Sequence, residues 1–163
     1  MKKILALLLA AVMVLGLCAC GSNGGTNGGD STKGRNSTVD SKTKVSVFWY
    51  DESDVYLSSV RTELNNKLNA VGVKYDNQYA AGDQAKQLDQ IKTAIAGGSN
   101  LLVVNVVTSG TPDVAKDILN LAGNIPVIFF NRAIGTDGSD VEVLKGSNTA
   151  CFIGTDAPEA GHM

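Results

Sequence analysis

The chain has 163 residues, with 14 Lys and Arg, 16 Asp and Glu and a formal net charge of −2. With 44% hydrophobic residues it has enough apolar material for one globular domain. No basic run follows Lys2 and Lys3, so the charge pattern of a nucleic-acid-binding protein is absent and no nucleic-acid partner is expected. A single histidine, His162, and three cysteines argue against a zinc site or a Ser-His-Asp triad.

Residues 1–20 are typical of a secretory signal peptide. Two lysines precede an apolar run over residues 4–17, which is short for a membrane span. The ending Leu17-Cys18-Ala19-Cys20 resembles a bacterial lipobox and predicts lipidation at Cys20. The expected location is therefore extracytoplasmic, anchored by lipid to the bacterial cell membrane; an ordinary cleaved signal and an uncleaved anchor are the alternatives.

Residues 21–43 form a segment of different composition. Of these 23 residues, 17 are Gly, Ser, Thr or Asn, and Val39 is the only aliphatic one. Such a segment cannot bury enough apolar surface to fold, which predicts a flexible linker. It either spaces a domain from the membrane or is a disordered leader without that role. The part that folds is then residues 44–163.

The first half of this folding part predicts two strand–helix pairs. Residues 45–50 are a β-rich run, and residues 73–79 are a second, more polar one. Between them, apolar residues at spacings of three and four predict one face of an amphipathic helix: Leu57, Val60, Leu64, Leu68 and Val71. A second helix is expected from about Asp83 to the glycines at 97–98, with Leu88, Ile91 and Ile95 on one face.

The second half continues the alternation. Residues 101–107 predict a central strand buried on both faces, and Thr111 predicts the N-cap of a helix whose buried residues are Val114, Ile118 and Leu121. Residues 127–130 and 151–153 predict two more strands, with Cys151 buried in the core. Asp156 and Glu159 are spaced as a capping box and predict one further helix.

The apolar runs begin at residues 45, 73, 101 and 126, at steps of one βα unit. This alternation predicts an α/β fold, a doubly wound parallel sheet with helices on both faces. In such sheets ligands bind beyond the carboxyl ends of the strands, so function is expected there.

Polar and aromatic side chains stand at three of these predicted strand ends. The first strand is followed by Tyr50, Asp54 and Tyr56, and no glycine-rich phosphate loop follows any strand. Carboxylates accept hydrogen bonds from hydroxyls and aromatic rings pack on sugar C–H faces, although acidic first turns also occur as ordinary partners of the helix dipole. Asn105 ends the third strand, where a buried amide is costly unless it is paired or serves a ligand. Asn131 and Arg132 end the fourth.

Four segments together resemble a known family. The runs VSVFWYDESDVYLSSVR, LLVVNVV, IPVIFFNR and FIGTDAPEAG are similar to the N-terminal lobe of galactose/glucose-type periplasmic sugar-binding proteins, the type I solute-binding components of ABC importers. The resemblance covers essentially all of residues 44–163. It implies a two-lobed clamp that closes on a pyranose, hydrogen-bonding its hydroxyls and stacking it between aromatic rings.

The resemblance also implies roles for the residues after the first strand. Tyr50 and Asp54 match family positions, with Asp54 accepting hydrogen bonds from sugar hydroxyls. Tyr56 falls where the family usually has a stacking Phe, so the ring is kept and a hydroxyl is added. Trp49, inside the strand, is expected to pack in the core, and Asp51 and Glu52 are expected on a solvated face.

At the later strand ends, the resemblance implies that Asn105 is the amide that contacts ring-side oxygens of the sugar. Arg132 follows Asn131 where related proteins carry a basic residue that reaches the ligand, and both are candidate ligand-binding residues. Gly154 belongs to a turn near the family's hinge and is expected to be structural.

The family is about twice as long as this folding part. Its second lobe supplies the opposing aromatic residue and, in galactose-type members, a calcium loop, so no cofactor or metal is expected within these residues. The chain is therefore expected to be a fragment, from a truncated gene, an early stop or an incomplete sequence.

The predicted function is that of a substrate-binding lipoprotein of an ABC sugar importer. It would capture a monosaccharide such as galactose or glucose and present it to a permease, without catalysis. The alternative is a sensor module that binds a sugar or small signal and docks on a chemoreceptor or histidine kinase. A repressor of related fold is disfavoured by the signal peptide.

Overall fold

The structure is a computed structural model that describes residue 40 and residues 42–154. The predicted signal peptide, Cys20, most of the 21–43 linker, the helix expected at Asp156 and His162 lie outside the described residues. The limits of these segments therefore stay predictions.

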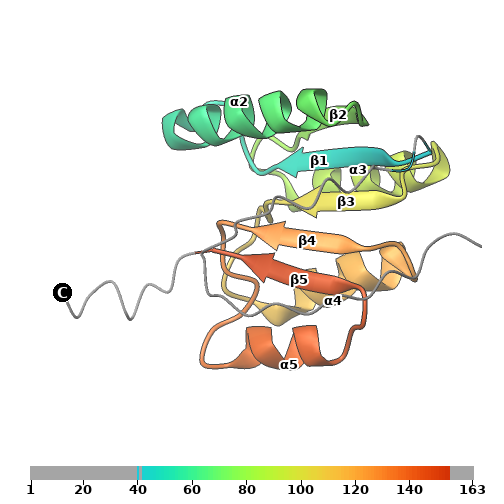
Figure 1. Ribbon diagram of the computed structural model, residues 1–163. Coiled ribbons are helices and arrows are strands. Elements are labelled where there is room, and N and C mark those ends of the chain that lie inside the picture. The colour runs from blue at the N-terminus through green and yellow to red at the C-terminus, as the bar shows by residue number, and fades with distance from the viewer. Residues whose placement is uncertain (1–39, 41, 155–163) are drawn as a thin grey trace, which may run out of the picture. The chain divides into compact units, whose positions relative to one another are not determined.

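Five parallel strands form one sheet in the order β2-β1-β3-β4-β5. The arrows of β1, β3, β4 and β5 in Figure 1 point in the same direction, and β2 is paired parallel to β1, so the carboxyl ends of the strands gather along one edge. The α/β prediction with a parallel sheet is confirmed. The strands are β1 (Lys44–Trp49), β2 (Lys74–Tyr79), β3 (Leu101–Val104), β4 (Val127–Phe130) and β5 (Ala150–Ile153).

Helices cover both faces of this sheet, as the doubly wound prediction requires. The helices are α2 (Val55–Ala70), α3 (Gln84–Ala96), α4 (Pro112–Ala122) and α5 (Ser139–Lys145). One face packs against α3, α4 and α5 around buried residues such as Phe48, Ile118 and Phe129. The other packs against α2 around Val47, Trp49 and Leu57. Trp49 is completely buried, as expected from its place within the strand.

Local sequence signals explain where the helices begin. Asp54 and Asp83 are the N-caps of α2 and α3, and their carboxylates accept hydrogen bonds from Leu57 N and Lys86 N. Thr111 is the N-cap of α4 as predicted, but its side chain makes no capping hydrogen bond. Each cap directly follows a strand and a short loop, which places the amino ends of these helices near the carboxyl edge of the sheet.

Two elements differ from the prediction. β3 ends at Val104 rather than at residue 107, because side chains of α3 take the backbone hydrogen bonds that would continue the strand. The short helix α5 was not predicted: it has seven residues, about two turns, which is too short a run to establish a helical period.

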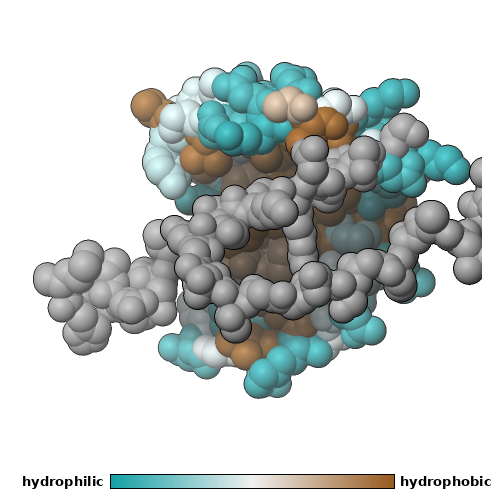
Figure 2. All heavy atoms as spheres, in the orientation of Figure 1, coloured by the Kyte–Doolittle hydropathy of each residue, from teal (hydrophilic) through white to brown (hydrophobic). Residues whose placement is uncertain are grey.

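The prediction that Cys151 is buried is wrong. Strand residues alternate between faces, and Phe152 packs against the large cluster under α3, α4 and α5. Cys151 and Ile153 point to the opposite face, where both are exposed at the β5 edge. Figure 2 shows hydrophobic surface over the sheet beside α2. The apolar residues of β5 therefore predicted a strand, but they did not indicate which face of that strand other elements cover.

Candidate functional site

The strand order reverses direction between β1 and β3, the position at which α/β sheets bind ligands. Tyr50 follows β1, Asn105 follows β3, and Asn131 with Arg132 follows β4. These three strands are direct neighbours, so the tertiary structure brings side chains from distant parts of the sequence to one edge. We call this region the carboxyl-edge site.

Tyr50, Asp54 and Arg132 form its first group. The Tyr50 hydroxyl donates a hydrogen bond to Asp54 Oδ2 at 2.6 Å. The Arg132 guanidinium carbon lies 4.2 Å from the centroid of the Tyr50 ring, a stacking distance for a cation on an aromatic face. A phenol, a carboxylate and a guanidinium thus lie in one contiguous surface that can both donate and accept hydrogen bonds.

The Asp54 carboxylate already has protein partners. Oδ1 accepts from Leu57 N at 2.9 Å as the cap of α2, and Oδ2 accepts from Tyr50. The hydrogen bond from Tyr50, followed by that from Leu57 N, lowers the pKa of Asp54 below its ordinary 3.8. The same bond, together with partial burial, raises the pKa of Tyr50 above 10.0. Asp54 is therefore held as a carboxylate and Tyr50 as a neutral phenol.

Asn105 is completely buried and almost fully satisfied. Its backbone N–H donates to Phe48 O at 2.8 Å, and its Nδ2 donates to Phe130 O and to Asn131 Oδ1, both at 3.1 Å. Only Oδ1 lacks a hydrogen-bond partner. An unpaired buried acceptor is costly, so this atom is the place in Asn105 where a ligand hydroxyl or a water would be stabilising.

Asn131 and Arg132 complete the end of β4. Asn131 has a left-handed φ of 63°, which asparagine adopts more readily than most residues. Its side chain then receives the hydrogen bond from Asn105. Arg132 Nη2 donates to Val107 O at 2.9 Å, whereas its buried Nε has no partner. The site therefore holds one unpaired buried acceptor and one unpaired buried donor.

Tyr56 lies apart from these groups. It is in the first turn of α2, 65% exposed, and lines a hollow of about 260 Å³ with Val60, Phe130, Asn131, Ile153 and Gly154. Asn131 is the residue that this hollow shares with the hydrogen-bonded groups. The structure thus offers an aromatic face on the rim of the site rather than in its interior.

Asp51 and Glu52 are not drawn into the site. The Ser53 side chain and backbone N–H both donate to Asp51 Oδ1, which lowers the pKa of Asp51. Glu52 is exposed. Glu52 agrees with the predicted solvated face, whereas Asp51 is half-buried.

Two glutamines of α3 were missed by sequence reasoning. Gln87 is completely buried and bonds the backbone on both sides of Val106, while Gln84 Oε1 accepts from Thr108 N at 2.9 Å. The available signal was their spacing: residues 84, 87 and 91 fall on one helical face, so two polar residues occupy the stripe that Ile91 continues.

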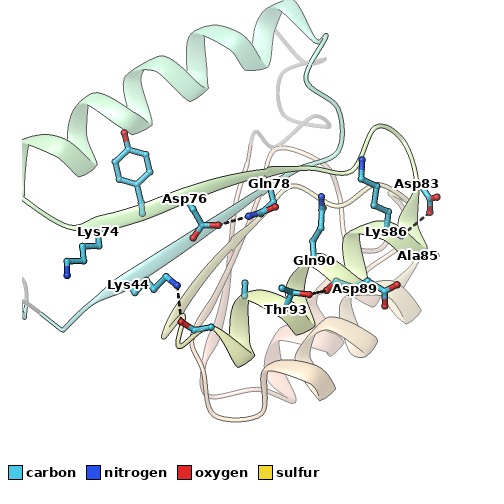
Figure 3. Close-up of a pocket in the computed structure, with 13 residues that line it drawn as sticks. Lys44, Lys74, Asp76, Gln78, Asp83, Ala85, Lys86, Asp89, Gln90 and Thr93 are labelled. Carbon is cyan, nitrogen blue, oxygen red and sulfur yellow. Dashed lines mark hydrogen bonds between the residues drawn. The ribbon is translucent and has the colours of Figure 1, made fainter.

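A larger hollow than the one beside Tyr56 lies elsewhere. It is a groove of about 940 Å³ between α3 and the edge strand β2. Figure 3 shows that its labelled side chains are mainly charged or amide groups, such as Lys74, Asp76, Lys86 and Asp89. None of the predicted site residues lines this groove. We call it the β2 groove.

Within residues 42–154, no group of three or more His, Cys, Asp and Glu side chains is placed to hold a metal ion. In the same part of the chain, no helix combines the length and the apolar character needed to cross a membrane.

The model of a family described as "periplasmic binding protein domain" matches residues 45–163, which is most of the chain. The protein belongs to this family. Members bind ligands rather than catalyse reactions, and they work outside the cytoplasm. The carboxyl-edge site is thus a candidate ligand site of a periplasmic binding protein lobe.

Three solved structures share the fold. The Caulobacter myo-inositol binding protein, bound to myo-inositol, is 22% identical, with a TM-score of 0.58 over 76% of this chain and 38% of that one. A carbohydrate transporter solute-binding protein from Agrobacterium radiobacter, in complex with D-arabinose, is 18% identical, with a TM-score of 0.58 and the same coverage. The fructose-binding periplasmic domain of a hybrid two-component system is 22% identical, with a TM-score of 0.56 over 73% and 36%.

These identities establish a common fold and nothing finer. The chain spans less than two fifths of the length of each of these proteins. The structural neighbours include both a sugar-binding and a polyol-binding protein.

Proposed function

We propose that the protein is the substrate-binding component of an ABC sugar importer and captures a monosaccharide, galactose or glucose in the first instance, at the carboxyl-edge site. The observation that carries this proposal is the pair of unpaired buried groups, Asn105 Oδ1 and Arg132 Nε, beside the Tyr50–Asp54 hydrogen bond. A polyhydroxylated ligand matches that set, because each hydroxyl both donates and accepts.

Each residue has a distinct part in this proposal. Arg132 donates to a sugar oxygen and Asn105 accepts from a hydroxyl. Asp54 accepts through the lone pairs that Leu57 N and Tyr50 leave free, and Asn131 orients the Asn105 amide. The exposed Tyr56 ring packs on the C–H face of the sugar from the rim of the site.

The described residues surround such a ligand incompletely. Closed binding sites bury most of a ligand's surface, whereas the hollow beside Tyr56 is small and open to solvent. We therefore expect weak binding by this chain, with a Kd of about millimolar or higher. In longer members of the family, a second lobe would close over the sugar by hinge motion.

The first experiment is isothermal titration of the purified chain with galactose, glucose, ribose, D-arabinose and myo-inositol. One sugar should bind more strongly than the others, and Arg132→Met should weaken that binding at least about tenfold, the effect of about 1.4 kcal/mol. Lys86→Met, in the β2 groove, is the matched control and should leave binding unchanged. Equal loss in both variants, or no binding of any sugar, would argue against the proposal.

The proposed cellular place is the outer face of the bacterial membrane, with a lipid on Cys20 and an ABC permease as the partner. Lipid attachment is tested by growing cells with labelled palmitate and comparing the chain with its Cys20→Ser variant. Label on the parent chain and none on the variant is the expected result. Absence of label on both chains would argue against lipidation and favour an ordinary cleaved signal peptide.

A second candidate function is a sensor module that hands a bound sugar to a receptor or histidine kinase. The similarity to the periplasmic domain of a hybrid two-component system is the observation that favours it. Co-purification from membranes of the source cell separates the two: a permease subunit supports import, and a kinase or chemoreceptor supports sensing.

A further inference from the structure

The backbone of residues 105–108, which we call the 105–108 segment, leaves the sheet after β3 and is held from two sides. On one side lie Gln84 and Gln87, in the first turn of α3. On the other lies Arg132, at the end of β4. The segment therefore links α3 to the carboxyl-edge site, although α3 itself contains none of the predicted ligand-binding residues.

Gln87 uses both ends of its amide on this segment. Nε2 donates to Asn105 O at 2.9 Å, and Oε1 accepts from Val107 N at 3.2 Å. The side chain is completely buried, so these bonds replace water that the amide has lost. A side chain of similar size without polar atoms would fill the same space and hold neither backbone group.

The position of Val107 in turn determines that of Arg132. Val107 O accepts from Arg132 Nη2 at 2.9 Å, and the same guanidinium lies over the Tyr50 ring. Tyr50 then donates to Asp54. A continuous series of contacts thus runs from Gln87 through the segment to the groups that we propose contact the sugar.

We propose that Gln87 is a positioning residue of the carboxyl-edge site: by fixing the 105–108 segment it holds Arg132 over Tyr50 and keeps Asn105 Oδ1 at the ligand-facing edge. This inference rests on the proposed function. Gln84 assists by binding the next backbone amide, Thr108 N. Neither glutamine needs to touch the ligand.

The test compares Gln87→Met with Gln90→Met in the full chain. Gln90 lies on the same helix three residues later, and its Nε2 donates to Tyr79 O of β2 rather than to the segment, which makes it a matched control. Both variants remove one buried or half-buried amide and keep a linear side chain. General loss of stability would affect both.

The first measurement is hydrogen exchange followed by NMR, at the Val107 and Thr108 amides and at the Arg132 Nε–H, whose burial should slow its exchange in the parent chain. Gln87→Met should speed exchange at these positions at least about tenfold, while amides of β4 stay protected. Gln90→Met should leave all of them unchanged. Equal protection in the parent chain and Gln87→Met would overturn the inference.

The second measurement is the affinity for whichever sugar of the galactose, glucose, ribose, D-arabinose and myo-inositol set the parent chain binds. Gln87→Met should weaken it about tenfold and Gln90→Met less than about twofold. Normal affinity in Gln87→Met overturns this inference alone. Absence of binding by the parent chain overturns the proposed function, and the inference with it.

A third variant covers the case in which Gln87→Met does not fold. Gln84 is only half-buried, so Gln84→Met should fold, and it removes the bond to Thr108 N. Faster exchange at Thr108 together with a smaller loss of sugar affinity is the expected result. Unchanged exchange and affinity would contradict the positioning role of this helix face.

Discussion

The carboxyl-edge site and the β2 groove differ in the burial of their polar groups, and their volumes do not indicate this difference. The groove is several times larger than the hollow beside Tyr56, about 940 Å³ against 260 Å³. Most of its charges are exposed, and the pair Lys92–Asp89 is made within one helix by side chains that are more than half exposed. Such surface pairs contribute little, and solvent already satisfies them.

At the carboxyl-edge site the polar groups are fewer, and they include one fully buried side chain and a half-buried guanidinium. Asn105 has no exposed surface, and Asn105 Oδ1 and Arg132 Nε lack partners. The groove contains one comparable atom, Gln90 Oε1. Unsatisfied buried groups on adjacent strand ends, rather than the volume of a hollow, therefore locate the better candidate for ligand binding. Four predictions test this difference, in order of decreasing effect.

The largest effect is expected for Asn105→Leu. The variant removes the donor of Asn131 Oδ1 and one of the two donors of Phe130 O, which keeps the bond from Arg132 N, at a cost of about 1–3 kcal/mol in the free energy of unfolding. Urea denaturation measures it. Asp89→Leu, on the exposed wall of the β2 groove, should change stability by less than about 0.5 kcal/mol. Equal stability of the two variants would contradict the claim that the buried polar group contributes more to stability than the exposed one.

The next effect concerns the rim. Tyr56→Ala should weaken sugar binding by roughly three- to tenfold, since an aromatic contact contributes about 0.5–1.5 kcal/mol. Stability should change little because the ring is 65% exposed. Tyr56→Phe keeps the ring and is the control for the hydroxyl. Titration with the sugar that binds the parent chain gives both values, and unchanged affinity in Tyr56→Ala would place the stacking surface elsewhere.

The hydrogen bond between Tyr50 and Asp54 predicts that the stability of the chain depends on pH at both an acid and an alkaline limit. The lowered pKa of Asp54 contributes stability above pH 3.8 that is lost as the pH falls through the folded-state value. The raised pKa of Tyr50 contributes stability below pH 10.0 that is lost as the pH rises through its folded-state value. Arg132 opposes the rise in the Tyr50 pKa, and Asp51 adds to it.

Tyr50→Phe removes the hydrogen bond that is the largest cause of both pKa shifts. Its stability relative to the parent chain should therefore be lowest between these limits and approach parity beyond them. Urea midpoints collected from acid to alkaline pH measure this profile. A constant difference at every pH would show that the bond does not couple the two groups.

The smallest effect is expected in the β2 groove. Lys44 Nζ donates to Gly97 O at 2.9 Å, at the carboxyl end of α3, where a cation stabilises a helix by about 0.3–1 kcal/mol. Lys44→Met should lower stability by that amount and leave sugar affinity unchanged. A large change in affinity would transfer the candidate site from the carboxyl edge to the groove.

Sequence patterns were sufficient for most of the fold. The strand at 127–130, the N-cap at Thr111 and a helix start near Asp83 were predicted where the structure has them, whereas Asp54 was not predicted as a cap. Periodicity and capping are local properties, which is why they can be read from neighbouring residues. The short α5 was not predicted because seven residues are too few to show a helical period.

The candidate site was harder to predict from the sequence than the fold. Strand ends could be located, so Tyr50, Asn105 and Arg132 could be chosen. Gln87 could not, because its bonds to Asn105 and Val107 join residues 18 and 20 positions apart. Such pairing depends on how α3 lies against β3, and helix position is not a local property.

The sequence by itself determined the order of strands and helices and the edge of the sheet to which polar residues belong, because these follow from spacing and from the parallel βα alternation. Only the tertiary structure decided which of those residues are buried. It left Tyr56 and Cys151 exposed, buried Asn105 with one atom unpaired, and placed Arg132 over Tyr50. Burial depends on which elements cover a face, and that is fixed by packing between distant parts of the chain.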